Sequence, residues 1–434
     1  MNAHGALTDT DVAIVGAGPA GSALALQLAR EGVRVLLLDR AAFPRAKPCG
    51  DCLSAEATRV LDRLGLSSAI EAAGPARLDG WRIIAPDGSS FSALFRDMAC
   101  ADPRVASALA LPRQQLDHIL LEAARAAGAE VRTRATVTAV ETGAAPHIVA
   151  RTDSGVLRFR ARIVIGADGL RSLVARRTGV IRRAPRRRKF SLTAHISGAT
   201  MPDALGEMHV SPGMCAGLAP VGAGTFNLTV VADSDRYARA VARDPAAFFR
   251  FALRRFPMLP ERLAHAKLDD EPLFDGARGP LRGGAHASGL LASGPFDVPT
   301  RRTFGDGFAL LGDAAGYFDP FTGQGVYQAL RGAELLAPAL LNALASPAAA
   351  FRHLDAYAAA QRRLTRPARV LQRVVDTVLR YPAFTDLAIR RLAAAPAAAN
   401  ALLAATADVR APVSLLSPAV VLSFALPVQW RPAP

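Results

Sequence analysis

The stretch that decides the fold is residues 11–21, which read DVAIVGAGPAG. The apolar residues after Asp11 predict a short buried strand. The Gly16-x-Gly18-x-x-Gly21 spacing that follows predicts a tight turn into a helix. Gly16 permits the turn, Gly18 lets the backbone approach a pyrophosphate, and Gly21 lets the helix pack close to the sheet. The stretch therefore predicts the first half of a dinucleotide-binding unit.

The residues after this turn complete the unit. Small residues over 22–30 predict the helix, and the apolar run 33–38 predicts a second strand that ends at Asp39. An acid at this position can accept hydrogen bonds from an adenosine ribose, and it argues against a ribose that carries a 2′-phosphate. The sequence therefore predicts an α/β fold that binds FAD or NAD, with the pyrophosphate at the helix N-terminus.

Two later strands also end in carboxylates. One leads into Gly-Ala-Asp-Gly at Asp168, and another leads into Gly-Asp at Asp313. Ligands of open α/β sheets bind at the carboxyl ends of the strands, so both acids are placed to hold sugar hydroxyls. A helix over 326–341 opens at Gly325, where bare backbone N–H groups and the helix dipole can meet an electron-rich ligand.

The composition is that of a folded enzyme with an excess of arginine. The 434 residues can bury a large core and predict two or three lobes. Lysine occurs only at positions 47, 189 and 267, so 52 − 3 = 49 of the basic residues are arginine, and the formal net charge is +15. The arginines are scattered except for a dense run over 182–189. A solvated loop explains this run better than a dedicated polyanion site, and we expect no nucleic-acid partner.

Cysteine usage and hydropathy bear on the compartment. Four cysteines in so long a chain do not make a disulfide scaffold. The first ten residues lack the charged and apolar regions of a signal peptide, and no apolar run reaches the ~20 residues of a membrane span. A cytoplasmic protein is expected.

Cys49 and Cys52 form a C-x-x-C pair soon after the dinucleotide turn. A zinc site would need a second pair of ligands nearby, which the sequence lacks, so no metal is expected. Two hypotheses remain: a redox dithiol that exchanges electrons with a flavin, and a pair of loop cysteines close to the cofactor. We favour the second.

The remaining segments predict a β-rich lobe and a helical C-terminal part. A hairpin over 80–95 and alternating strands over 189–231 indicate the lobe. Helical spacing over 352–391, followed by alanine-rich segments to residue 405, indicates the C-terminal helices. The other predicted elements are helices over 55–64, 112–127 and 245–256 and strands over 130–140, 148–152, 156–159, 162–165, 285–292 and 308–311.

The three strand-end motifs, together with Lys47-Pro48-Cys49-Gly50, resemble the single-component FAD-dependent hydroxylase superfamily. Within it the chain is most similar to the branch that includes the geranylgeranyl reductases, whose signature is such a Lys-Pro-Cys-Gly stretch after the first βαβ unit. The resemblance covers roughly residues 9–345.

The resemblance implies that FAD is the cofactor, that NAD(P)H is the electron donor, and that Cys49 approaches the flavin from the substrate side as a catalytic residue. The parts it implies are a Rossmann-like FAD-binding domain (8–78, 103–185 and 295–345), an inserted β-rich substrate domain (79–102 and 186–294) and a C-terminal helical extension (346–434). The residues expected to hold FAD are Gly16, Gly18, Ala20, Gly21, Asp39, Arg40, Arg113, Val137, Asp168, Gly312, Asp313, Pro320, Gly323, Gln324 and Gly325.

Several of these residues have a specific implied role. Asp39 would hold the adenosine ribose and Asp313 the ribityl chain. Arg113 would lie along the cofactor, and Asp168 would couple FAD binding to nicotinamide binding. The backbone of 323–325 would present N–H groups to the N1–C2=O edge of the flavin.

Two observations concern the substrate and the electron donor. Residues 214–220 (MCAGLAP) stand where the reductases carry an aromatic motif, which weakens the case for a polyprenyl substrate. No second glycine-rich strand–turn–helix occurs, because Gly222-Ala-Gly224 precedes a predicted strand. A separate nicotinamide-binding domain is therefore not expected.

These features predict an FAD-dependent oxidoreductase that acts on an apolar small molecule. We expect a monooxygenase that uses NAD(P)H and O2. The alternatives are an alkene reductase of the geranylgeranyl reductase type and a flavin-binding electron-transfer or regulatory protein. Flavin-dependent halogenases are recognised by a Trp-x-Trp-x-Ile-Pro motif and by a catalytic lysine well past the first turn. The only tryptophans here are Trp81 and Trp430, and no lysine lies between Lys47 and Lys189, so we reject a halogenase. His195 and His209 lie in the predicted substrate lobe as candidate proton donors, and peripheral membrane contact is a further expectation.

Overall fold

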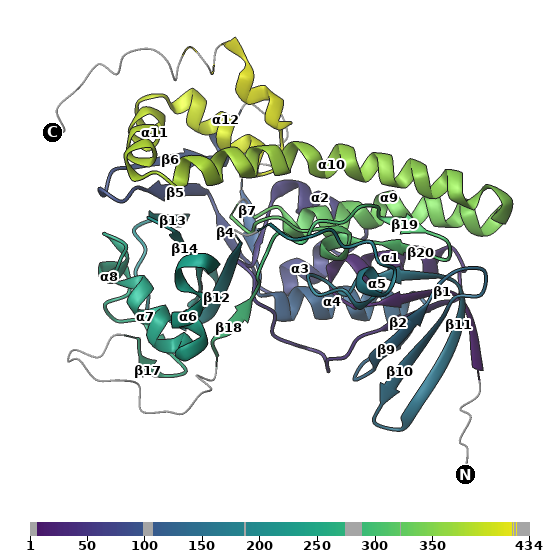
Figure 1. The fold of residues 1–434 in the computed structure, drawn as a ribbon. Helices are drawn as coiled ribbons and strands as arrows, with labels where there is room; N and C mark the ends of the chain where they lie inside the picture. The colour runs from purple at the N-terminus through teal and green to yellow at the C-terminus, as the bar shows by residue number, and fades with distance from the viewer. Residues whose placement is uncertain are drawn as a thin grey trace.

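We describe the fold from a computed structural model of the chain (Figure 1). The structure describes residues 7–98, 107–185, 188–273, 289–321, 323–418, 420 and 422. Cys100, Arg186, Arg187 and the start of the predicted strand 285–292 lie outside this part of the chain.

The first sheet carries the dinucleotide motif. Within the described residues its main path runs β19-β20-β11-β1-β2-β8, with β10 and β9 added beside β11. Its strands are β1 (Leu7–Val15), β2 (Val35–Leu38), β8 (Glu130–Arg132), β9 (Thr136–Glu141), β10 (His147–Thr152), β11 (Gly155–Gly166), β19 (Phe304–Gly305) and β20 (Phe308–Leu310). The four central neighbours, β20, β11, β1 and β2, pair in parallel, so the ends of β1, β11 and β20 meet at one edge. This is the Rossmann-like fold that the sequence predicted.

Helices bury one face of this sheet. α1 (Pro19–Arg30), α4 (Arg113–Ala126) and α9 (Gly325–Ala345) contribute Leu24, Leu116, Leu330 and neighbouring apolar residues to one core. α2 (Ala55–Arg63) and α3 (Ser67–Ala72) extend it, and α5 (Leu173–Arg177) packs on the opposite face. A short sheet of β3 (Cys52–Leu53), β7 (Ala108–Ala110) and β4 (Ala76–Leu78) lies beside them.

The second sheet forms the β-rich lobe. Among the described residues its order is β17-β16-β12-β15-β14-β13-β5-β6, and β18 pairs with β12. Its strands are β5 (Gly80–Ile84), β6 (Ser90–Leu94), β12 (Lys189–Ser197), β13 (Leu205–Ser211), β14 (Met214–Gly222), β15 (Thr225–Asp233), β16 (Lys267–Leu268), β17 (Glu271–Pro272) and β18 (Leu291–Ser293). α7 (Pro245–Leu253) and α8 (Leu259–Arg262) share a core with one face, beside α6 (Ser234–Arg243).

The C-terminal helices join the two sheets. α10 (Ala350–Leu379) runs along α9, and α11 (Pro382–Ala394) and α12 (Pro396–Thr406) cover β5 and β6 (Figure 1). A 3-10 segment, η5 (Pro412–Leu416), follows. No single helix in the described ranges has the length and apolarity of a membrane span, whereas α11 and α12 pass such a test as a pair that bends by 110°.

The boundaries differ from the prediction at several places. The predicted strand 130–140 is two strands, because Arg134 adopts a positive φ of 53° and turns the chain between β8 and β9. The predicted strands 156–159 and 162–165 are one strand, β11, whose early residues pair with β10 and whose later residues pair with β20. The predicted strand 285–292 is shorter in its described part, where β18 begins at Leu291. The amphipathic helix α6 was not predicted.

Candidate active site

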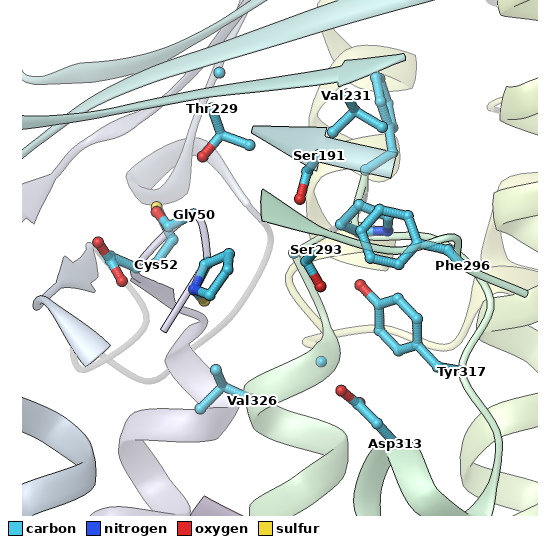
Figure 2. A pocket seen from close by; sticks show the side chains of 18 of the residues that line it. Gly50, Cys52, Ser191, Thr229, Val231, Ser293, Phe296, Asp313, Tyr317 and Val326 are labelled. Carbon is cyan, nitrogen blue, oxygen red and sulfur yellow. The ribbon is translucent and has the colours of Figure 1, made fainter. Parts of the chain in front are cut away.

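A cavity of about 1110 Å³ runs between the two sheets and the C-terminal helices. It begins at the glycine turn after β1, passes Cys49 and ends among side chains of α10–α12. In Figure 2 the side chains of Ser191 and Thr229 reach into it from the β-rich lobe, and Asp313 and Val326 lie on the opposite side. The volume exceeds the ~300–1,000 Å³ of common small-ligand pockets, so the cavity has room for more than one ligand.

The glycine turn forms the cofactor end of the cavity. Gly16 has φ +104°, and a Cβ there would lie 2.4 Å from the Ala167 oxygen. A Cβ on Gly21 would lie 1.9 Å from the Gly16 oxygen, so only glycine lets α1 approach the sheet. Asp39 accepts hydrogen bonds from the backbone N–H of Ala17 (2.9 Å) and so fixes the turn at the end of β2. The tight turn at Gly16 and the close packing at Gly21 are as the sequence predicted, and the pyrophosphate and ribose contacts of Gly18 and Asp39 stay predictions.

Two arginines, Arg45 and Arg113, lie beside this turn, and the sequence predicted a cofactor role only for Arg113. Arg113 donates to both oxygens of the buried Asp117 carboxylate, at 2.7 and 2.9 Å. Arg45 Nη1 lies 3.1 Å from the same carboxylate. A Cβ on Gly18 would lie 3.7 Å from Arg45 Nη2 and 4.0 Å from Arg113 Nη2, so both guanidinium groups face the place of a pyrophosphate.

Asp168 and Asp313 bring two carboxyl groups to the same cleft. Asp168 Oδ2 accepts a hydrogen bond from the Leu173 N–H at 2.6 Å, whereas its buried Oδ1 has no partner among the described residues. Burial raises the pKa of both carboxyls, and nearby Lys47 and Arg113 partly oppose the shift at Asp313. Burial, with Arg113 beside it, also lowers the pKa of Lys47. A ligand hydroxyl would satisfy the free Asp168 oxygen.

FAD fits this end of the cavity. Its pyrophosphate needs bare backbone and cations, and its ribityl hydroxyls need acceptors. The glycine turn, Arg45 and Arg113 supply the first set, and the carboxyls of Asp313 and Asp168 supply acceptors. Among the described residues, no group of three or more His, Cys, Asp and Glu side chains is arranged to hold a metal ion.

The loop 312–325 is held by the C-terminal helices. Arg369 donates to the Gly316 oxygen at 3.0 Å, and Gln372 donates to the Asp319 oxygen at 3.3 Å. Lys189 Nζ lies 2.9 Å from Asp319 Oδ2 and 2.5 Å from Asp376 Oδ1. Asp319, for which the sequence indicated no role, therefore ties β12, this loop and α10 together.

Most of the predicted cofactor residues line the cavity, and two do not. Gly21 packs inside the turn, and the side chain of Gln324 points away to Asp408, to which it donates at 2.5 Å. The predicted residues that line the cavity are Cys49, Gly16, Gly18, Ala20, Asp39, Arg40, Arg113, Val137, Asp168, Gly312, Asp313, Pro320, Gly323 and Gly325.

Burial affects both thiols of the C-x-x-C pair in the same direction. Burial raises the pKa of the Cys49 thiol, although Arg113 beside it acts in the opposite direction. Burial also raises the pKa of the Cys52 thiol, and its Sγ donates to the Gly50 oxygen at 3.2 Å. Reactive dithiols need a stabilised thiolate, so these surroundings disfavour the redox hypothesis.

A carboxylate–histidine pair lies next to Cys49. Asp51 is 1% exposed and has φ +57°. Its carboxylate accepts hydrogen bonds from Asn227 Nδ2 at 2.7 Å and from the backbone N–H of Arg113 at 3.1 Å. His195 Nε2 lies 2.5 Å from Asp51 Oδ2, and the His195 side chain is 35% exposed. A buried acid at the cavity wall is thus linked to solvent. The sequence marked His195 but not Asp51.

His209 does not face the cavity. Strand alternation directs Met208 of β13 into the cavity and His209 to the opposite face, against Phe256. There His209 pairs with Glu207 at 3.1 Å. Burial alone would raise the pKa of Glu207, but His209 and Arg262 lower it to about 2. His209 is therefore structural, and its candidacy as a proton donor was wrong.

The far end of the cavity is an apolar arm. Its wall comes from β5, β6, α10, α11 and α12, which the sequence did not connect. Its side chains include Trp81, Ile83, Phe91, Phe95, Leu371, Val375, Val378, Leu379, Ile389, Leu392, Leu402 and Leu403. The polar end of the cavity, by contrast, carries Ser191, Thr193, Asn227 and Thr229 on β12 and β15.

The comparison with known proteins agrees with this geometry. The model of a family described as an FAD binding domain matches residues 9–214. Menaquinone reductase of Mycobacterium tuberculosis is 31% identical over 350 residues, which span 76% of each chain. The chain belongs to the FAD-dependent oxidoreductases.

Other relatives of this FAD-dependent oxidoreductase carry different names. Conditioned medium factor receptor 1 of Dictyostelium discoideum is 28% identical over 77% of this chain, and the chain spans 63% of that relative's length. Tryptophan 2-halogenase of Chondromyces crocatus is 26% identical over 78% of this chain and 62% of its own length. The structure of Pseudomonas aeruginosa PqsL in complex with 2-aminobenzoylacetate has a TM-score of 0.69, at 25% identity over 87% of this chain and 98% of PqsL.

Proposed function

We propose that this FAD-dependent oxidoreductase reduces a carbon–carbon double bond in an apolar small molecule, with NAD(P)H as the electron donor. The observation that carries the proposal is the continuity of the cavity from the cofactor end, past Cys49 and Asp51, into the apolar arm. Bound FAD would supply hydride. The chain's own residues would then have to hold the substrate, exclude water and deliver a proton.

The division of labour follows the walls of the cavity. Residues 8–78, 103–185 and 295–345 would hold FAD, residues 79–102 and 186–294 would hold the substrate, and residues 346–434 would close the apolar arm. Cys49 would line the substrate side of the flavin. We keep the cytoplasm as the expected compartment.

The Asp51–His195 pair favours reduction. Addition of hydride to one carbon of a double bond requires a proton at the other carbon. Asp51 lies at the cavity wall, and His195 is exposed enough to exchange protons with water. A proton would pass from His195 Nε2 to Asp51 and from Asp51 to the substrate carbon, and His195 would recover it from solvent.

A second candidate function is hydroxylation of an apolar substrate with O2, as the sequence suggested. The likeness to PqsL supports it, since another structure of that protein is titled "a probable FAD-dependent monooxygenase". Mixing the reduced protein with O2 and, separately, with a panel of polyprenyl compounds and conjugated alkenes distinguishes the two functions. Reoxidation that depends on the alkene and is slow in O2 supports reduction. Rapid oxidation by O2 with a hydroxylated product supports the second function.

The proton path has its own test. We expect His195→Gln to slow alkene-dependent turnover by about 10²-fold and to flatten its pH profile. Reduction of the flavin by NAD(P)H should be unchanged, because it does not use the substrate wall. His147→Gln is the matched control, because His147 is half-buried like His195, lies on β10 of the other sheet and pairs with Glu141 at 3.5 Å. Equal turnover in both variants would remove His195 from the mechanism.

A further inference from the structure

The apolar arm of the cavity reaches the protein surface. Val374 of α10 lines the cavity and is also 55% exposed. Leu415 of η5 and Val420 line the same arm. These residues place one end of the apolar arm at α10 and the C-terminal segment, where a lining side chain is also largely exposed.

The surface around this end is apolar. Among the described residues, eleven large apolar side chains are exposed, and all but Val156, Phe251 and Phe351 lie between residues 370 and 422. These eight residues form what we call the C-terminal patch: Val370, Val374, Tyr381, Phe384, Leu387, Val413, Leu416 and Leu422. α10 contacts α11 and η5, and α12 contacts both α11 and η5, so the patch spans neighbouring elements. Clustered apolar exposure of this kind marks a binding surface.

We propose that the C-terminal patch docks on a lipid bilayer and that the apolar substrate enters the cavity there. The proposal rests on the proposed function, since it takes the apolar arm as the substrate site. A protein partner on the patch would close the end of the arm. A bilayer covers the same side chains and also dissolves an apolar substrate.

Charge and side-chain type support a bilayer as the occupant. Arg373 and Arg380 are exposed beside the patch, where Arg373 lies over the Phe318 ring and Arg380 pairs with Asp376 at 3.3 Å. Cationic groups add attraction to anionic headgroups, and Phe and Leu supply the buried apolar contact. The Tyr381 ring packs edge-on against Phe384 at 6.0 Å, and tyrosine is typical of the membrane–water interface.

Vesicle co-sedimentation of the full FAD-loaded chain tests the proposal without turnover. The vesicles are phosphatidylcholine alone and phosphatidylcholine mixed with phosphatidylglycerol. We expect binding to both, stronger to the anionic mixture and weakened by salt. Phe384→Asp combined with Leu416→Asp should reduce the partition coefficient at least about tenfold, because two buried apolar side chains are lost.

Phe351→Asp is the matched control. Phe351 is 71% exposed and packs on one aromatic ring, as Phe384 does, but it lies at the other end of α10. FAD content and melting temperature, measured for each variant, exclude unfolding as the cause. Absence of wild-type binding, or an equal loss in the control, overturns the proposal. A wild-type dimer that only the patch variant dissociates also overturns it, because the patch is then an interface between copies. A wild-type protein that binds vesicles but reduces no alkene would instead contradict the proposed function and leave the docking proposal standing.

Discussion

At the scale of single residues, Arg45 is the least expected part of the cofactor end. Its guanidinium shares the Asp117 carboxylate with Arg113 and lies 3.8 Å from Asp39 Oδ2. We expect Arg45→Ala to weaken FAD binding by about 10- to 100-fold, because a charge-assisted hydrogen bond contributes about 1.5–3 kcal/mol. Flavin fluorescence during titration of the apoprotein measures the change.

Arg34→Ala is the control for this experiment. Arg34 pairs with Asp11 at 3.0 Å on the exposed side of the same sheet and does not line the cavity. Its FAD affinity should match the wild type. If Arg45→Ala also binds FAD as tightly as the wild type, Arg45 does not contribute to FAD affinity and Arg113 is the arginine that does.

Asp408 gives a prediction about pH. Burial raises the pKa of its carboxyl to about 8, although the hydrogen bond from Gln324 acts in the opposite direction. In the unfolded chain an aspartate has a pKa near 3.9, so between about pH 4 and pH 8 the folded state binds one proton more than the unfolded state. This difference makes stability fall by up to about 1.4 kcal/mol per pH unit as the pH rises through that window.

Asp408→Asn should remove this dependence. Asparagine tolerates the positive φ of 64° at this position, and its oxygen can still accept from Gln324. The variant should melt at a higher temperature than the wild type near pH 8, and the difference should shrink near pH 5. Parallel melting curves at the two pH values would show that Asp408 is ionised in the folded protein.

The sequence could predict the residues whose role depends on the backbone, because a close approach of the backbone requires glycine. Gly16, Gly18 and Gly21 are recognisable because a pyrophosphate and a close helix exclude any side chain at fixed spacing. Arg45 and Asp117 were missed because nothing in their local sequence says that a loop and a helix meet above the turn. Asp51 was missed for a similar reason, since its partner His195 lies 144 residues away.

At the scale of elements, Lys189 joins β12, the loop 312–325 and α10. Burial alone would lower its pKa, but Asp319 and Asp376 outweigh this effect and raise it. We expect Lys189→Met to cost about 3 kcal/mol of unfolding free energy, because it leaves the buried Asp319 carboxylate without its cation, whereas Asp376 keeps Arg380 at 3.3 Å. FAD affinity should fall as well, since the loop that carries Asp313 loses its anchor. Urea unfolding and flavin titration measure the two effects.

The double variant Lys189→Met/Asp319→Asn separates charge from packing. It should recover part of the lost stability, because the amide at position 319 needs no cation. If the double variant is no more stable than Lys189→Met, the loss comes from packing of the lysine stem and the ion network is not the cause.

The helices of the C-terminal part show where prediction from sequence stops at this scale. Their spacing predicted helices over 352–391, and α10 and α11 occupy that range. The same spacing could not say which neighbour Leu371, Val375 and Val378 face, since a core and a cavity select the same apolar side chains. These residues line the apolar arm, so the helices belong to the site.

At the scale of the whole molecule, no single part forms the cavity. The Rossmann-like sheet supplies the cofactor end, β12 and β15 supply the hydroxyl and amide groups, and β5, β6 and α10–α12 supply the apolar arm. A ligand that fills it would be polar near the cofactor and apolar at its far end. β14 lies between these regions and lines the cavity with Cys215, Gly217, Leu218 and Ala219, in the stretch where the reductases carry aromatic residues.

The small side chains of β14 are therefore expected to set the length of the substrate. A Cβ on Gly217 would meet only Met208 Cε, at 3.8 Å, so a side chain there can point into the cavity without a clash. We expect Gly217→Phe to divide the cofactor end from the apolar arm and to weaken binding of a fluorescent long-chain fatty acid at least about tenfold. Gly217→Ala, the matched small substitution, should bind the fatty acid as the wild type does. FAD affinity should stay unchanged in both variants, because the cofactor end lies on the other sheet. Equal fatty-acid binding by Gly217→Phe and the wild type would mean that such a chain does not pass β14.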